Sequence, residues 1–276
     1  MKRILLPFVS LLAALALPSC LQQATTIHLN KDGSGTIVEE TTFGAQMAAM
    51  LGGLGGLGGE NAKDPLADLV SEDKAKARAA KLGEGVTVEK SEAIDANGSK
   101  GARVTYRFAD INKLKFTNSG GLQDSMPAMP GAPAANEPIE KPTTFKYADG
   151  TLTIITPEQE KPAADQNKSP EGGLPPEAAD LQGEQMEGMM KQMLGDMKMS
   201  MKVVIEPGIA ETTATHVTGN TITLMEMDMG KVMKNPDAFK KLKGMDQNDQ
   251  DKAIEALKGF DGVKVEVKKE ITVKVK

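Results

Sequence analysis

Apolar and charged residues alternate through the last part of the chain, and this pattern restricts the fold more than any other feature. The apolar members are Val263, Val265, Val267, Ile271, Val273 and Val275, and Lys264, Glu266, Lys268, Glu270 and Lys274 lie between them. A period of two residues is typical of a β-strand with one buried and one solvent-facing side. Only Lys269 interrupts the apolar face, so we expect a sheet edge or a bend there.

The same alternation recurs in segments joined by short turns, which predicts β-hairpins. The expected pairs are 25–30 with 36–43, 86–94 with 101–108, and the two halves of 143–156. Their turns read KDGSG, Asn97-Gly98 and Asp149-Gly150, and glycine supplies the positive φ that tight turns need. Further strands are expected at 199–206 and 220–227, around Pro207-Gly208 and Gly219-Asn220.

Three segments carry helix signals. Residues 64–83 start with Asp64 as an N-cap and Pro65 at the first helical position, and they end at Gly83. Residues 235–244 and 248–259 are also expected to be helices, and each ends at a glycine. Helices that fall between sheet segments without strict alternation predict an α+β fold, mainly antiparallel hairpins and sheet with a few helices on one face.

Three low-complexity segments interrupt the single domain expected over residues 20–276. Those at 119–142 and 157–185 are rich in Pro, Gly, Ala and acids, so we expect long disordered loops. The segment at 44–59, GAQMAAMLGGLGGLGG, has no charge. Because glycine is a poor helix former, we expect a mobile apolar loop there. The alternative is a segment that dips into the membrane, since small residues allow close packing in lipid.

The first residues have the parts of an export signal. Lys2 and Arg3 form a basic start, an apolar run follows, and small residues precede Cys20. The run is about fifteen residues, shorter than the roughly twenty that span a bilayer. We therefore interpret residues 1–19 as a signal peptide and not as a transmembrane helix.

The end of this signal, Leu17-Pro18-Ser19-Cys20, resembles the bacterial lipobox. That resemblance implies cleavage between Ser19 and Cys20, and lipidation, including palmitate, of Cys20 as the new N-terminus. Pro18 departs from the small aliphatic residue usual at its position. Leu21 stands where lipoproteins retained in the inner membrane carry Asp. The resemblance thus implies a lipoprotein of the cell outer membrane that faces the periplasm.

Charge and cysteine content limit what the mature chain can do. Cys20 is the single cysteine, so no intramolecular disulfide can form. The formal net charge is −5, and it becomes −7 once Lys2 and Arg3 are removed. Such a chain has no electrostatic attraction to nucleic acid or to anionic lipid headgroups, so we expect its membrane attachment to depend on the covalent lipid.

Part of the body also resembles known proteins. The segment at 83–116, GEGVTVEKSEAI…GARVTYRFADINKLKF, and the strand IHLNKDGSGTIVEE are similar to uncharacterised bacterial envelope lipoproteins of unknown function. The similarity spans about half of the mature chain. It implies an envelope location and carries no catalytic residue with it.

Catalytic signals are sparse. The chain has two histidines, and His28 and His216 are far apart in Thr-rich surroundings, which favours solvent-facing strand or loop positions over a metal or catalytic pair. Gly33-Ser34-Gly35 lacks the strand-to-helix setting of a nucleophile elbow and predicts a turn. Residues 246–252 resemble a calcium loop only superficially, and they fit a helix cap better.

Methionine is the unusual component of the composition, with 17 in the chain, clustered at 185–201 and 225–233. Thioethers suit Cu(I), so Met186, Met189, Met190 and Met193 are candidate copper ligands. The alternative is packing or a Met-rich partner surface, because methionine is an adaptable core residue and the chain has no tryptophan. Alternation of Met199, Met201, Val203 and Ile205 along a strand favours packing.

These patterns together predict a lipid-anchored, non-catalytic envelope protein that acts as a binding or assembly component without a cofactor. Its expected partners are the membrane, through the N-terminal lipid, and another envelope protein. Two alternatives remain from the sequence. One is a Met-rich Cu(I)-binding lipoprotein, and the other is a hydrolase whose site has no local motif.

Overall fold

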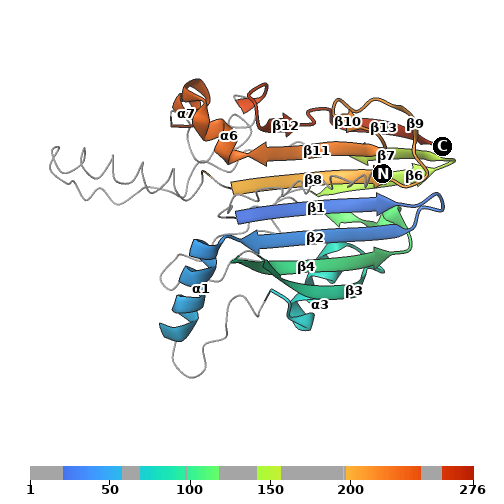
Figure 1. The fold of residues 1–276 in the computed structure, drawn as a ribbon. Coiled ribbons are helices and arrows are strands. Elements are labelled where there is room, and N and C mark those ends of the chain that lie inside the picture. Colours follow the sequence, from blue (N-terminus) through green and yellow to red (C-terminus); the bar gives the residue numbers. More distant parts are fainter. Residues whose placement is uncertain are drawn as a thin grey trace, which may run out of the picture.

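The large sheet gathers strands from both halves of the chain. The computed structural model describes residues 21–57, 69–96, 98–117, 142–156, 195, 197–243 and 257–276. The sheet has the order β10-β11-β8-β1-β2-β4-β3, and β12 also pairs with β11 (Figure 1). Its strands are β1 Leu21–Leu29, β2 Gly35–Phe43, β3 Thr87–Ala96, β4 Ser99–Phe108, β8 Met197–Ile205, β10 Val217–Thr218, β11 Thr221–Asp228 and β12 Val263–Val265.

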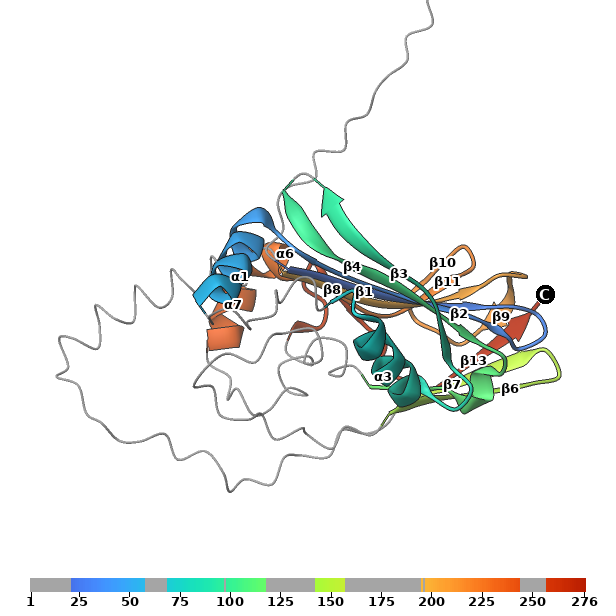
Figure 2. The same cartoon turned by 90° about the horizontal axis from the view of Figure 1, so that it is seen from below.

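A second, five-stranded sheet packs against the first, in the order β5-β6-β7-β13-β9 (Figure 2). Its strands are β5 Lys115–Phe116, β6 Thr143–Ala148, β7 Thr151–Ile155, β9 Ile209–Thr212 and β13 Glu270–Val275. Every strand pair is antiparallel among the described residues except β1 with β8, which is parallel. The predicted α+β class with mainly antiparallel strands is confirmed.

The three predicted hairpins form as expected. β1 pairs with β2, β3 with β4, and β6 with β7. Asp149 and Gly150 both have positive φ, at 50° and 71°, as a tight two-residue turn requires. The turn after β1 is held by Asp32, whose Oδ1 accepts hydrogen bonds from the N and Oγ of Ser34.

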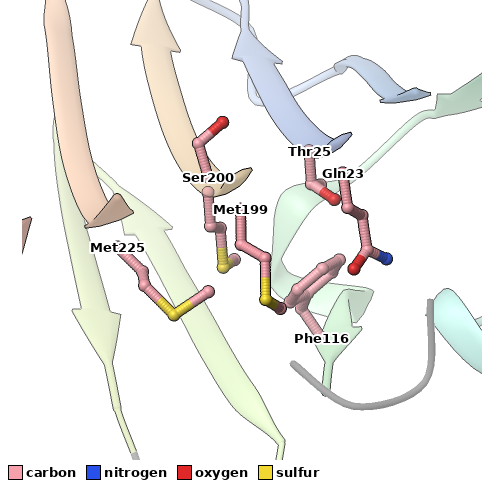
Figure 3. Close-up of a pocket in the computed structure, with 7 residues that line it drawn as sticks. Gln23, Thr25, Phe116, Met199, Ser200 and Met225 are labelled. Atoms are coloured by element: carbon pink, nitrogen blue, oxygen red, sulfur yellow. The ribbon is translucent and has the colours of Figure 1, made fainter. Parts of the chain in front are cut away.

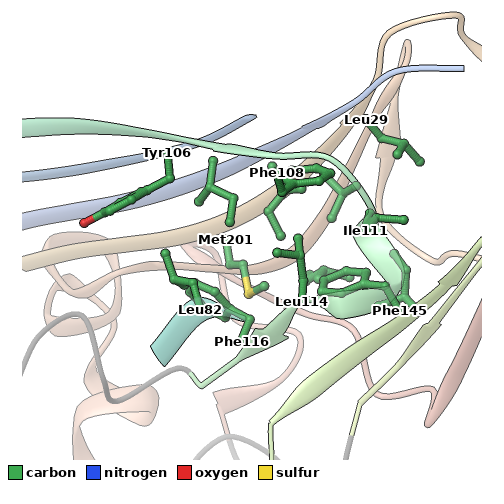
Figure 4. Close-up of a cluster of buried hydrophobic side chains, with 14 of the residues drawn as sticks. Leu29, Leu82, Tyr106, Phe108, Ile111, Leu114, Phe116, Phe145 and Met201 are labelled. Carbon is green, nitrogen blue, oxygen red and sulfur yellow. The ribbon is translucent and has the colours of Figure 1, made fainter. Parts of the chain in front are cut away.

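Buried apolar side chains fill the space between the sheets (Figure 4). The core combines the inner faces of β1, β2, β4 and β8 with those of β6, β7 and β13. Its largest fully buried members include Tyr106, Phe108, Phe145, Ile27, Leu29, Leu82, Ile111 and Leu114. The period-two pattern therefore places one face of each strand in a shared interior.

The helices are α1 Ala45–Leu57, α3 Glu72–Leu82, α6 Met229–Lys234 and α7 Pro236–Lys243, with a 3₁₀ turn at Ile111–Lys113. α1, α6 and α7 gather at one end of the large sheet (Figure 1), and α3 lies beside the small sheet, on the same side of the large sheet (Figure 2). α7 starts as predicted, because Asn235 Oδ1 accepts hydrogen bonds from the backbone N of Asp237 and of Ala238.

Residues 69–71 are not helical, although a helix is expected over 64–83. Leu69 and Val70 lie in a turn, and α3 begins at Glu72, after Ser71. Acidic Glu72 and Asp73 then occupy the first turn, where they suit the helix dipole. Asp64 and Pro65 lie outside the described residues. The expected end at Gly83 is confirmed.

Segment 44–59 differs from the expected loop, because residues 45–57 form α1. Ala48 and Leu51 on this helix are buried against Leu21 and Phe43. Burial of these side chains offsets the low helix propensity of the glycines, a tertiary effect that propensity alone does not contain. The prediction of a loop was wrong over 45–57.

The C-terminal alternation breaks where Lys269 predicts a bend. β12 and β13 belong to different sheets, and the chain crosses between them at 266–269. The side-chain phase also shifts here, since Glu266 is buried and Val267 is 48% exposed. The expectation that Glu266 faces solvent with the neighbouring lysines was therefore wrong.

Glu266 is buried because it binds the loop before β10. Its carboxylate accepts hydrogen bonds from Thr215 N at 2.5 Å, Thr215 Oγ1 at 2.9 Å and Lys268 N at 3.2 Å. Burial alone would raise the pKa of Glu266, but the hydrogen bonds from Thr215 and Lys268, with the charge of Lys268, hold this pKa below its ordinary value.

Replacing Glu266 by glutamine should lower the free energy of unfolding at pH 7 by about 1.5–3 kcal/mol, the usual worth of hydrogen bonds to a charged group. A lowered folded-state pKa stabilises above the unfolded pKa, and this contribution is lost as the pH falls through the folded pKa. The difference between the parent protein and Glu266→Gln should therefore shrink in acid. Urea unfolding at pH 7 and pH 3 measures it, with Glu211→Gln in an exposed ion pair as the control. A difference that stays constant with pH would contradict this account.

Candidate functional site

The predicted lipidation site adjoins the most central part of the large sheet. Ser19 and Cys20 lie outside the described residues, as does the whole of 1–19. β1 begins at Leu21, the very next residue, and pairs with β2 on one side and β8 on the other. Leu21 is 8% exposed and belongs to a cluster with Phe43, Ala48 and Leu51. The folded body therefore begins at the residue directly after Cys20.

We call this the α1 end of the molecule, defined by Leu21, Phe43, α1, Met197 and α6. A second apolar cluster lies at this end, formed by Met229, Val232, Ala238, Leu257 and Val263. Asp228 caps α6 there by accepting a hydrogen bond from Lys231 N at 3.2 Å. The α1 end therefore has its own packed interior, apart from the main core.

The inner face of the large sheet carries a small cavity (Figure 3). It is lined by Gln23, Thr25, Phe116, Met199, Ser200, Met201 and Met225. The volume open to water is about 10 Å³, which is room for about one water molecule. Gln23 Oε1 is buried and has no hydrogen-bond partner within the described part of the chain. The cavity is therefore sized for water and offers hydroxyl, amide and thioether groups.

A buried ion pair lies between α3 and the same face of the sheet. Arg78 Nη2 is 2.7 Å from Glu39 Oε1, and Arg78 Nε lies 3.2 Å from both oxygens of Glu39. The two side chains are 7% and 15% exposed. The guanidinium of Arg78 also lies over the ring of Phe116, at 5.6 Å from its centroid. This geometry joins helix, large sheet and small sheet through one cation.

Comparisons with known proteins add one structural neighbour. No family model matches the chain, and no curated protein matches it. Among solved structures, the folded domain of LppM from Mycobacterium tuberculosis is similar at 9% identity and a TM-score of 0.33. The match covers 77% of this chain and 85% of that domain. At this level of similarity, we draw neither fold nor function from the neighbour.

The histidines occupy separate, ordinary positions. His28 Nδ1 lies 2.7 Å from Glu206 Oε1 at the protein surface, which pairs β1 with the end of β8. His216 is half-buried just before β10, and its carbonyl accepts a hydrogen bond from Thr223 N. In the described ranges, no group of three or more His, Cys, Asp or Glu side chains could hold a metal.

The candidate copper ligands Met186, Met189, Met190 and Met193 lie outside the described residues, as do the superficial calcium loop at 246–252 and the segments at 119–141 and 157–185. Methionines that are described pack instead. Met201 and Met229 are buried, and Met225 and Met227 are partly buried against the apolar clusters. Packing is confirmed for these methionines, and copper binding at 186–193 stays a prediction.

Arg78, Glu39 and Gln23 are among the polar residues with buried atoms that the sequence patterns did not single out. A signal was present for two of them. Arg78 lies on the helical face of Ala75, Ala79 and Leu82, and Glu39 shares a strand face with Ile37 and Thr41. An arginine and a glutamate on opposing apolar faces indicate a buried pair.

Proposed function

We propose that this chain is a bacterial lipoprotein in which lipids on Cys20 hold a two-sheet body at the outer membrane, facing the periplasm. In this role the body is a non-catalytic binding or assembly component. The observation that carries the proposal is the direct junction between the lipobox-like Leu17-Pro18-Ser19-Cys20 and the first residue of β1. The expected cleavage between Ser19 and Cys20 removes no residue of β1, which begins at Leu21. Removal of the signal peptide is therefore compatible with the folded body.

The short junction has a mechanical consequence. Adjacent Cα atoms lie about 3.8 Å apart, so a lipid on Cys20 holds Leu21 at the membrane surface. A body tethered in this way has little freedom to diffuse away from the bilayer, unlike one on a long flexible linker. It would therefore meet partners that also lie close to the membrane.

Replacing Cys20 by serine tests the anchor. The variant should take up no labelled palmitate in cells and should accumulate as precursor that retains residues 1–19. Lipid labelling and the size of the protein on a gel measure both effects, with the parent chain as the control. Palmitate uptake by Cys20→Ser equal to that of the parent would contradict the proposal.

The outward face of the large sheet is the surface that we assign to an envelope protein partner. The small sheet and α3 lie on the opposite side of the large sheet, so no described element covers its outward face (Figure 2). It carries threonines and ion pairs, including Lys202 with Glu226 at 3.4 Å and Lys264 with Glu226 at 3.0 Å. Polar, charge-paired surfaces of this kind are typical of the rim of reversible interfaces.

Photocrosslinking in cells tests this assignment. A photoreactive residue at Thr26 or Thr105, both on the outward face, should capture a discrete envelope protein, whereas one at exposed Lys146 on β6 should not. Identical captures from all three positions, or none from the outward face, would contradict a partner surface there.

A further inference from the structure

α1 exposes an uncharged face at the α1 end of the molecule. No charged residue occurs between Gly44 and Gly59. Among the side chains of α1 whose burial is described, 45–49 and 51–53, Ala48 and Leu51 are buried, and Ala45, Gln46, Ala49, Gly52 and Gly53 are exposed. Surface helices of soluble proteins usually turn charged residues toward water on the side opposite the core. An exposed face of alanine and glycine with a single glutamine is unusual for a helix that meets only water.

The position of α1 indicates what covers this face. Its buried side packs on Leu21, the residue that follows Cys20. Lipids on Cys20 would enter the bilayer about one residue from this contact. The uncharged face of α1 and the lipid insertion point therefore lie at the same end of the molecule.

The dimensions and charge of α1 determine how it can meet the bilayer. Its 13 residues give a length of about 20 Å, less than the roughly 30 Å of a hydrocarbon core. Among the described helices, none has the length and apolar character needed to cross a membrane. The acidic mature chain is not drawn to anionic headgroups, so a contact would depend on apolar burial along the membrane surface.

We propose that α1 is a membrane-contacting helix that lies in the interfacial region of the bilayer beside the lipids on Cys20. This inference rests on the proposed function, because the lipids bring the bilayer to this end. The contact orients the body, with α1 against the membrane and the β1–β2 turn at the far end of the large sheet (Figure 1). The strands of the large sheet then extend away from the membrane, and the outward face of the sheet is accessible to neighbouring proteins.

An introduced tryptophan can report this contact, because the chain has none of its own. Gly53 is suitable, since a Cβ added there meets nothing within 4 Å. The lipidated Gly53→Trp protein would be placed in vesicles of phosphatidylethanolamine and phosphatidylglycerol, with or without brominated phosphatidylcholine. We expect a blue-shifted emission that loses most of its intensity when brominated lipid is present.

Lys31→Trp is the matched control, because Lys31 is exposed in the β1–β2 turn at the far end of β1. Its emission should be that of a water-exposed indole, with no quenching by brominated lipid. Ala49→Trp provides a second reporter on the same exposed face of α1. Far-UV circular dichroism identical to the parent shows that each variant is folded.

The outcomes separate this inference from the anchor itself. Lipid labelling and flotation with vesicles report the anchor, and brominated-lipid quenching reports α1. Flotation without quenching at residues 49 and 53 would overturn the membrane contact and leave the anchor intact. Equal quenching at residue 31 would overturn the orientation. A blue-shifted emission that brominated lipid does not quench, together with crosslinks between two copies of the chain, would overturn the membrane contact and show that α1 lies in an interface between copies. Absence of lipid label would remove both proposals.

Discussion

Replacing Arg78 by methionine should lower the free energy of unfolding by about 3–5 kcal/mol, because it leaves the buried carboxylate of Glu39 without its cation. Methionine keeps most of the volume and apolar contact of the arginine stem, so the loss would report the unpaired charge more than a cavity. Urea unfolding of the mature chain, followed by far-UV circular dichroism, measures the change in the free energy of unfolding.

Two further variants test the reason for this effect. Adding Glu39→Leu to Arg78→Met removes both charges and should recover most of the lost stability, since apolar replacement of a whole buried pair is often neutral. Arg103→Ala disrupts the exposed pair of Arg103 with Glu40 on the outward face and should cost no more than about 1 kcal/mol. If Arg78→Met and Arg103→Ala lower the free energy of unfolding equally, burial of the pair of Arg78 with Glu39 does not increase its contribution to stability, and the account is contradicted.

Replacing Gly35 by alanine should destabilise the protein by about 3 kcal/mol or more. A Cβ at Gly35 would lie 1.9 Å from the carbonyl oxygen of His28 and 2.6 Å from Cζ of Phe108. The first of these atoms belongs to the backbone of β1, so relief would require the β1–β2 pairing to shift. Thermal and urea unfolding measure the loss.

Gly53→Ala is the matched control for Gly35→Ala. Gly53 lies in α1 with open space around it, so the same change should stabilise the helix by about 0.5–1 kcal/mol. Opposite signs at the two positions are the expected result. Similar small effects at both would contradict the close approach of β1 and β2 at Gly35.

Local patterns were sufficient for the hairpins because both parts of the signal are local. Alternation defines the buried face of β1 and β2, and turn glycines define where the chain reverses. Pairing of β1 with β8 depends instead on a contact between residues such as Leu21 and Met197, which are far apart in the chain. No local pattern contains that pairing, and the parallel arrangement could not be predicted.

The misjudged positions share a physical cause. Low helix propensity predicts a loop at 44–59, yet packing of Ala48 and Leu51 on the end of β1 stabilises a helix. Alternation predicts that Glu266 faces water, yet hydrogen bonds from Thr215 hold it inside. In both cases tertiary contacts outweigh the local preference, and those contacts come from segments distant in sequence.

The candidate site was predicted unevenly for the same reason. The lipobox-like motif is a continuous stretch, so Cys20 could be recognised from the sequence. The cavity beside Gln23 and Met199 is assembled from β1, β5, β8 and β11, and no single segment contains its signal. Arg78 and Glu39 each interrupt an apolar face in the sequence, but that they pair with each other is seen only when helix and sheet are brought together.

The mass of the N-terminal peptide of the mature protein, isolated from the membranes of expressing cells, tests the anchor most directly. The account predicts a peptide that begins at Cys20 and carries the added mass of a diacylglycerol group, with none of residues 1–19. A mature chain that begins at another residue, or an unmodified Cys20 in the membrane fraction, would contradict it.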